Sequence, residues 1–157
     1  AITIPHGSTS GQRKGASFRM TSYVVNGLLT ALPKETKNRQ GRVILWAIKD
    51  ARLSINTTAA ILQDYTNIRS PYNMDTEGYS ILMDRYFTVA PPGQDGAVVK
   101  MNMFYRPKNW HLKWTNADTT GVVGAIEKGY IRIAIMCDQT TDAPNFAAYT
   151  RVKFVDN

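Results

Sequence analysis

The stretch that decides the fold is Gly41–Asp50, with the sequence GRVILWAIKD. Its middle, Val43–Ile48, is an unbroken run of six apolar residues, rich in β-branched and aromatic side chains. A run this short and this branched predicts a β-strand that is apolar on both faces rather than a helix. Pleating places three of its side chains on each face: Val43, Leu45 and Ala47 on one, and Ile44, Trp46 and Ile48 on the other. One face can fill a core, while the other needs a cover, and a second chain is one candidate for it.

Further strand-like segments follow along the chain. Residues 17–32 alternate loosely, and we expect a strand there that is broken near Asn26-Gly27. Other strands are predicted at residues 79–90, 98–105, 110–114, 122–127, 129–137 and 146–155, and the clearest turn at residues 91–96. A short helix is expected at residues 57–64, capped by Asn56 or Thr57. About eight short strands with one helical insert predict an all-β antiparallel sandwich or barrel.

The chain fits one domain with a flexible beginning. It has 157 residues, of which 43% are apolar and 20% charged, which is typical of a single globular unit. Residues 5–16 hold three glycines and no large apolar side chain. We therefore expect residues 1–16 to form a flexible basic arm and residues 17–157 to form the folded domain. Because no apolar run approaches the roughly 20 residues that span a bilayer, we expect no segment that crosses a membrane, and among the candidate partners we expect nucleic acid and no membrane.

Basic charge is concentrated in the first third of the chain. Residues 1–53 hold nine basic and two acidic side chains, which account for the whole net charge of +7, and the remaining residues are balanced. This asymmetry predicts contact with a polyanion, with nucleic acid the first candidate and an anionic membrane the second. The alternative is an ordinary basic surface without a specific partner.

The sequence lacks the motifs of common enzymes. Its two histidines, His6 and His111, and its single cysteine, Cys137, form no zinc-binding pattern. It contains no G-x-S-x-G nucleophile motif, P-loop or dinucleotide fingerprint. We therefore expect no catalytic activity, no metal and no cofactor.

Large aromatic residues are more numerous than one small sandwich needs, and some fall in turns or on strand faces that alternation would expose. Because Tyr and Trp are enriched at protein interfaces, we expect subunit contacts among Trp46, Tyr65, Tyr72, Tyr86, Tyr105, Trp110 and Trp114, from a wider set that includes Tyr79 and Phe104. The alternative for each is a core or scattered surface position. A carbohydrate-binding sandwich that stacks sugars on Trp110 and Trp114 is another interpretation, but it leaves the basic charge unexplained.

Several segments, in their order, resemble a viral coat protein. The apolar run continues through Lys49-Asp50-Ala51-Arg52 and is followed by Thr57-Thr58, the expected helix, and the segment GYSILMDR at residues 78–85. Near the end come IAIMCD at residues 133–138 and AYTRVKFVD at residues 148–156. This order is similar to that of coat proteins of geminiviruses and related small circular single-stranded DNA viruses, and of necrosis-type satellite viruses. Those coats usually begin with a long Arg/Lys arm, whereas only Arg13 and Lys14 precede the first expected strand here.

The resemblance implies a single eight-stranded antiparallel jelly roll of two four-stranded sheets, in which the last strand pairs with the first. It implies a capsid protein that self-assembles into a small icosahedral shell of about 60 copies around viral nucleic acid, with single-stranded DNA the expected cargo. Such a protein is found in the virion, and in the host nucleus or cytoplasm during assembly. The alternative is a single-stranded nucleic-acid-binding β-domain that does not assemble.

On this interpretation, basic side chains contact phosphates on the inner side of the shell. The residues expected to do so are Arg13, Lys14, Arg19, Lys34, Lys37, Arg39, Arg42, Arg151 and Lys153. The last two are included because alternation places them on one face of the final strand, which in a jelly roll lies beside the first.

Overall fold

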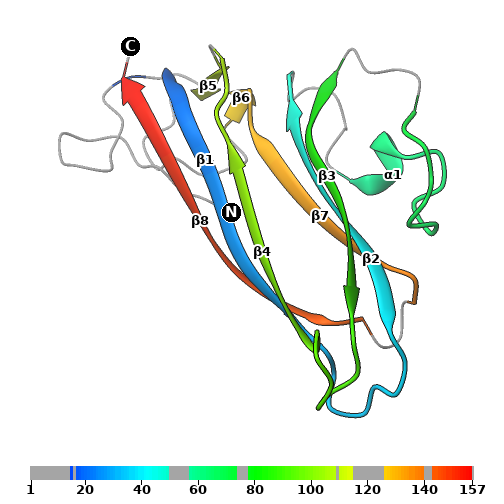
Figure 1. Cartoon of the computed structure of the whole chain (residues 1–157). Helices are drawn as coiled ribbons and strands as arrows, with labels where there is room; N and C mark the ends of the chain where they lie inside the picture. Colours follow the sequence, from blue (N-terminus) through cyan, green and yellow to red (C-terminus); the bar gives the residue numbers. More distant parts are fainter. Residues whose placement is uncertain are drawn as a thin grey trace.

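A computed structural model describes residues 15, 17–49, 57–73, 78–108, 110–114, 126–139 and 143–156. In this structure two antiparallel sheets face each other as a β-sandwich, and one short helix lies beyond the smaller sheet (Figure 1). The elements in chain order are β1 (Ser17–Thr30), β2 (Arg39–Ile48), α1 (Thr58–Ile61), β3 (Tyr79–Val89), β4 (Val98–Tyr105), β5 (Trp110–Trp114), β6 (Ile126–Lys128), β7 (Ile131–Cys137) and β8 (Asn145–Asp156).

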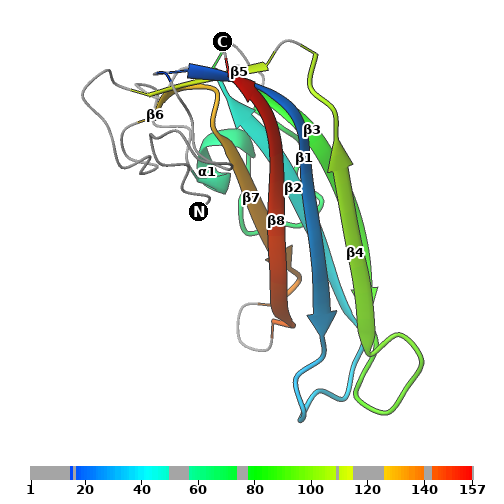
Figure 2. The same cartoon turned by 90° about the vertical axis from the view of Figure 1, so that its left-hand side faces the viewer.

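The larger sheet is built around β1. Strand β8 pairs with one edge of β1 along almost its whole length, while β4 and β5 share the other edge and β6 pairs with β5. Figure 2 views this sheet from outside, with β8, β1 and β4 side by side. The smaller sheet has the order β3-β2-β7. The predicted pairing of the first strand with the last is therefore present, but the strands divide five and three between the sheets, not four and four.

Strand β2 is the most buried element, as its composition predicted. Every residue from 41 to 48 is buried, so both faces of the strand are covered. The outer cover includes residues 57–73 of the same chain, which we call the insert. Nη1 of Arg42, on this face, donates to the backbone oxygens of Ile68 and Ser70 in the insert, at 3.2 and 2.6 Å. Trp46 lies on this face and is only 2% exposed. The prediction of Trp46 as a subunit contact is therefore wrong, because its side chain is already buried within the single chain.

Strand β1 is continuous through Asn26-Gly27, where the sequence predicted a break. Gly27 pairs with Met101 of β4 and with Ala148 of β8. A Cβ atom at Gly27 would lie 2.6 Å from the ring of Phe146, so the glycine makes room for that ring instead of ending the strand. The irregularity in β1 is a register shift between Met20 and Ser22 on the β8 side.

Most of the remaining elements lie close to their predicted ranges. Of the strand predicted at residues 122–127, residues 122–125 lie outside the described residues, and β6 begins at Ile126. Strands β4 and β5 begin and end at the predicted residues, while α1 is shorter than predicted and Thr57 caps it without a side-chain hydrogen bond. In the predicted turn at residues 91–96, Gly93 and Gly96 have φ angles of 81° and 90°, a region that glycine adopts readily. No helix in the described part of the chain is long and apolar enough to cross a membrane.

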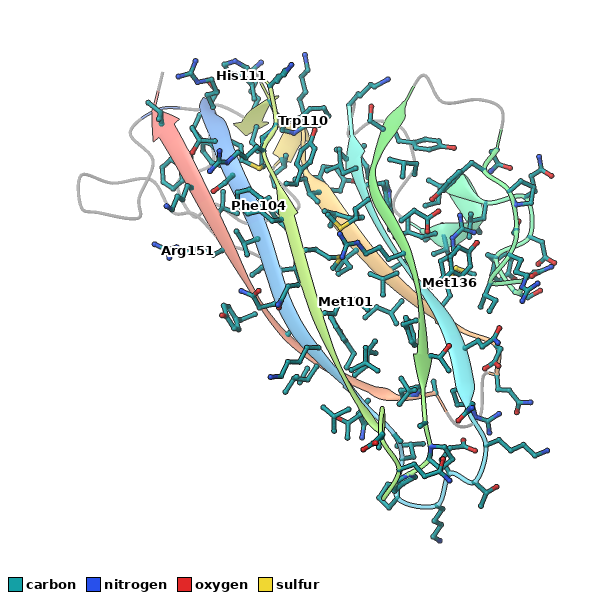
Figure 3. All side chains as sticks on the ribbon, viewed as in Figure 1. Met101, Phe104, Trp110, His111, Met136 and Arg151 are labelled. Atoms are coloured by element: carbon teal, nitrogen blue, oxygen red, sulfur yellow. The ribbon has the colours of Figure 1, made fainter. Side chains whose placement is uncertain are left out.

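The core fills the space between the sheets. Val25 and Leu29 of β1 and Met101 and Met103 of β4 are buried in one apolar cluster with Val43 and Leu45 of β2. Figure 3 shows Met101 pointing toward the smaller sheet, whereas Phe104 and Arg151 point away from it. The strands of the larger sheet thus present one apolar face to the core and a second face to the outside.

Candidate nucleic-acid interface

The outer face of the larger sheet is strongly basic. Because Tyr23, Val25 and Leu29 of β1 are buried, the alternate residues of β1 point outward. The registers place Lys153 opposite Ser22, Arg151 opposite Val24 and Lys100 opposite Leu28, so these cations share the outer side. Together with Arg19, between the buried residues Phe18 and Met20, and with Arg106, just after β4, they form what we call the basic face: Arg19, Lys100, Arg106, Arg151 and Lys153, all exposed.

No acidic side chain balances this charge among the outer-face positions that the structure describes on β1, β4, β5 and β8. Like charges gathered on one surface repel each other and produce a positive potential above it. Such a surface attracts a polyanion, and each phosphate that a Lys or Arg neutralises releases condensed counterions.

Two adjoining depressions run along the basic face. The first has a volume of about 460 Å³ and is lined by Thr21, Ser22, Val24, Asn26, Phe104, Arg106, Tyr149, Arg151 and Lys153. The second, of about 450 Å³, is lined by Asn26, Gly27, Leu28, Lys100, Asn102, Ala147, Ala148 and Tyr149. Because Asn26 and Tyr149 line both, the depressions form one shallow track along β1. Cations stand at both ends of this track, with Lys100 at one end and Lys153 at the other.

The structure brings together three of the basic residues that the sequence singled out. Arg19, Arg151 and Lys153 lie on the basic face, whereas Lys34 and Lys37 are exposed in the loop between β1 and β2. Arg13 and Lys14 lie outside the described residues. Sequence reasoning missed Lys100 and Arg106. Alternation along residues 98–105 puts Lys100 on the side of Phe104, but it does not reveal that this strand lies beside β1.

The side chain of Arg39 is bonded to Glu35 in the loop before β2, and this argues against the phosphate contact predicted for Arg39. It is 8% exposed, and its Nε donates to Oε2 of Glu35 at 2.6 Å. The backbone N–H groups of Thr36 and Lys37 both donate to Oε1 of Glu35 at 2.9 Å. These backbone hydrogen bonds, the one from Lys37 first, and the contact with Arg39 hold the pKa of the Glu35 carboxyl below its usual value. Arg39 therefore helps to fix the loop that leads into β2.

Arg42 is buried as well, and its predicted role at phosphates has to be corrected. Its Nε and Nη2 donate to the two carboxylate oxygens of Asp84 at 2.9 and 2.7 Å, and Tyr72 Oη donates to the same carboxylate at 2.6 Å. The guanidinium lies 4.9 Å from the ring centroid of Tyr72 and 5.3 Å from that of Tyr86. Because Nη1 also donates to the backbone oxygens of Ile68 and Ser70, four of the five guanidinium N–H groups are bonded inside the protein.

The same cluster shifts the pKa of its members. Burial alone would raise the pKa of the Asp84 carboxyl, but hydrogen bonds from Arg42 and Tyr72 outweigh it, so this pKa is lowered. The hydrogen bond to Asp84 raises the pKa of Arg42, and burial raises the pKa of the Tyr72 hydroxyl. Asp84 is thus ionised and Tyr72 neutral across the neutral range, which keeps the ion pair and the hydroxyl donor in place.

The aromatic candidates fall into three groups. Tyr65 and Tyr86 are each 58% exposed and stay candidates for subunit contact. Tyr72 is tied into the Arg42 cluster, and Tyr105 and Trp110 are half-buried against the core. The indole N–H of Trp110 donates to the backbone oxygen of Gly129, which fixes this half-buried side chain against the short connection between β6 and β7. The side chain of Trp114 lies outside the described residues.

No group of three or more His, Cys, Asp or Glu side chains that could hold a metal ion occurs within the described ranges. A scan against models of known protein families gave no match, and a search of curated proteins gave none either. The basic face therefore has to be interpreted from its own geometry and charge.

Proposed function

We propose that this chain is a capsid protein whose copies assemble into a closed shell and bind the packaged nucleic acid on the basic face. The observation that carries the proposal is the gathering of Arg19, Lys100, Arg106, Arg151 and Lys153 on one outer sheet face without a described acidic side chain. The insert covers the opposite side of the sandwich, so the two outer surfaces of the molecule differ: one is the basic face and the other carries the insert. A shell subunit needs such a difference, because only one of its surfaces faces the cargo.

The fold supports the same proposal. In the jelly roll that the sequence resemblance implies, the last strand lies beside the first, and β8 does lie beside β1. The pairing of β2 with β7 continues the same nested order. We infer that the sandwich is a jelly-roll variant in which β3 and β4 occupy the edges next to β2 and β1.

Binding on this face would be physical and largely independent of sequence. Phosphate contacts supply affinity without reading the bases. The affinity falls as the salt concentration rises, because salt cations compete with Lys and Arg side chains for the phosphates of the nucleic acid. For a single strand, the logarithm of the binding constant is expected to fall with the logarithm of salt concentration with a slope of about 0.7 per phosphate contact. Removing two contacts lowers this slope by about 1.4.

The test combines particle size with nucleic acid content. Multi-angle light scattering and electron microscopy of the purified chain should find closed particles far heavier than the 17.6 kDa monomer. The variant Arg151→Gln/Lys153→Gln should form particles that retain less nucleic acid. The control Arg69→Gln/Arg85→Gln, which removes the same charge from exposed positions outside the basic face, should retain the wild-type amount. Equal loss in both variants would refute the assignment of the basic face.

A second candidate function is a nucleic-acid-binding β-domain that remains monomeric. The specific observation in its favour is that exposed aromatic rings lie beside the basic groups, because such rings can stack unpaired bases. Particle size separates the two: a monomer that binds nucleic acid through the same residues would favour this candidate and end the capsid proposal.

A further inference from the structure

The outer face of the larger sheet carries exposed aromatic rings among its cations. Tyr149 of β8 is 66% exposed and Phe104 of β4 is 51% exposed. The registers place Tyr149 opposite Asn26 and Phe104 opposite Val24, so the two rings stand on either side of β1. Both rings line the first of the two depressions, together with Arg106, Arg151 and Lys153.

Exposure of an aromatic ring to water costs free energy, which a partner that covers the ring would recover. The groups around the two rings restrict the chemistry of such a partner. The floor of the track is mixed: Thr21, Ser22 and Asn26 are polar, whereas Val24 lies opposite Phe104 and Leu28 makes the second depression more apolar. The guanidinium of Arg106 lies over one face of the Phe104 ring, 5.2 Å from its centroid, so a cation and an exposed ring stand together in the first depression. A ligand that fits has flat faces, polar edges and negative charge at regular intervals.

We propose that the track binds one unpaired strand of nucleic acid, with bases stacked on Tyr149 and Phe104 and phosphates held by Arg106, Arg151 and Lys153. Bases inside a duplex are already stacked on each other and leave no face for these rings, whereas the bases of a single strand are available. This inference rests on the proposed nucleic-acid function of the basic face and specifies the strandedness of the ligand and the groups that recognise it.

The length of the track agrees with this ligand. Six residues separate Ser22, opposite Lys153, from Leu28, opposite Lys100. At about 3.4 Å per residue the track is about 20 Å long. The smallest known sites of single-strand-binding β-domains hold about four nucleotides, so the track suits a short segment of strand on each subunit.

Fluorescence anisotropy with a labelled oligothymidine and with a labelled duplex tests the proposal on the 157-residue chain. Tyr149→Ala should weaken oligothymidine binding by about tenfold and leave duplex binding within about twofold of the wild type. Tyr149→Phe, which keeps the ring, should bind as the wild type does, while Tyr149→Leu should bind as weakly as the alanine variant. The control Val98→Ala removes an exposed apolar side chain from the same sheet face outside the track and should change neither affinity. Circular dichroism should show that all variants are folded.

Failure of the inference differs from failure of the proposed function. If Tyr149→Ala leaves oligothymidine binding unchanged, or weakens single-strand and duplex binding equally, stacking is overturned while the basic face can still bind phosphates. If Arg151→Gln/Lys153→Gln changes neither affinity, the basic face is not the binding surface and the proposed function is overturned with it. If vesicles containing phosphatidylserine compete with oligothymidine for the wild type, and Tyr149→Leu binds them as well as the wild type does, the face is a membrane surface and the inference is wrong.

Discussion

At the scale of single residues, burial decides what a basic side chain does. Arg42 and Arg151 are the same residue type, and both were expected to contact phosphates. Arg42 is 3% exposed, held by Asp84 and by carbonyl groups of the insert, so it joins the insert to the sheet. Arg151 is exposed beside a depression that can hold a ligand. A charge is costly inside a protein unless it is paired, so a buried arginine is tied to its partners and unavailable to a ligand.

Replacing Arg42 by lysine should destabilise the protein. Lysine keeps the charge but cannot donate to both carboxylate oxygens of Asp84 while it also reaches the carbonyl oxygens of Ile68 and Ser70. Loss of charge-assisted hydrogen bonds should lower the free energy of unfolding by about 2 kcal/mol, measured by urea denaturation. Arg69→Lys, at an exposed position in the same insert, should change it by less than about 0.5 kcal/mol. Equal stability of the Arg42 variant would contradict the role given to this cluster.

Stability in acid should depend on Asp84. Its pKa is lower in the folded state than the value of about 3.9 in an unfolded chain, so the unfolded state binds more protons in acid. The contribution of Asp84 is therefore present above about pH 4 and is lost as the pH falls through the lowered pKa. The difference in unfolding free energy between the wild type and Asp84→Asn should be constant above about pH 5 and should shrink as the pH falls from about 5 to about 2 in denaturation experiments. A constant difference would show that Asp84 has an ordinary pKa.

At the scale of elements, β2 is the central strand of the smaller sheet, and at Gly41 both neighbouring strands, β3 and β7, pack closely against it. Gly41 pairs with Phe87 of β3 and with Cys137 of β7. The ring of Phe87 occupies the space beside Gly41 where a side chain would stand, and the backbone oxygen of Met136 is 2.5 Å from the position of a Cβ. Gly41, the first residue of the stretch that decides the fold, is thus needed because Phe87 and the backbone of β7 fill the space where a side chain would stand.

Gly41→Ala should therefore destabilise the sandwich. Because a backbone oxygen cannot turn away as a flexible side chain does, the added methyl group has to push β2 and β7 apart. Overpacking of this kind costs about 2 kcal/mol, which thermal or chemical denaturation would detect. Gly15→Ala adds the same methyl group where the nearest atoms are 3.9 Å away and should be nearly neutral. If the two variants were equally stable, close packing at Gly41 would not matter.

At the scale of the whole molecule, the sandwich has an open side. Within the described part of the chain, β7 pairs with β2 alone and β8 pairs with β1 alone, so both strands present an unpaired edge. Ile131, Ile133 and Ile135 of β7 are only partly buried at this side. Natural proteins usually cover or pair such edges, because exposed edges promote association.

If the chain assembles as proposed, this side should become protected in the particle. Hydrogen exchange read by mass spectrometry should slow in β7 and β8 when subunits form particles, because a neighbouring copy covers their edges. Strand β2, which is buried in the single subunit, should exchange slowly in both states. Exchange in β7 and β8 that is identical in particles and subunits would place the contacts elsewhere.

Local patterns in the sequence predicted much of the strand content. The apolar run of β2 and the alternating segments of β4 and β5 are signals between neighbours in the chain, and those strands lie where they were expected. The continuity of β1 could not be predicted, because the space beside Gly27 is filled by Phe146 from the other end of the chain. Of the candidate site, Arg19, Arg151 and Lys153 were anticipated, while Lys100 and Arg106 were not.

The sequence by itself determined that the chain folds mainly into β-strands and carries an excess of basic charge, because side-chain period and composition are properties of residues close together in the chain. It left open whether the strands form a sandwich or a barrel. Only the tertiary structure decided which strands are neighbours, which arginines are buried and which cations share a face with Tyr149 and Phe104. These outcomes depend on contacts between residues far apart in sequence, such as Arg42 with Asp84 and Val24 with Arg151, and a local pattern does not encode such contacts.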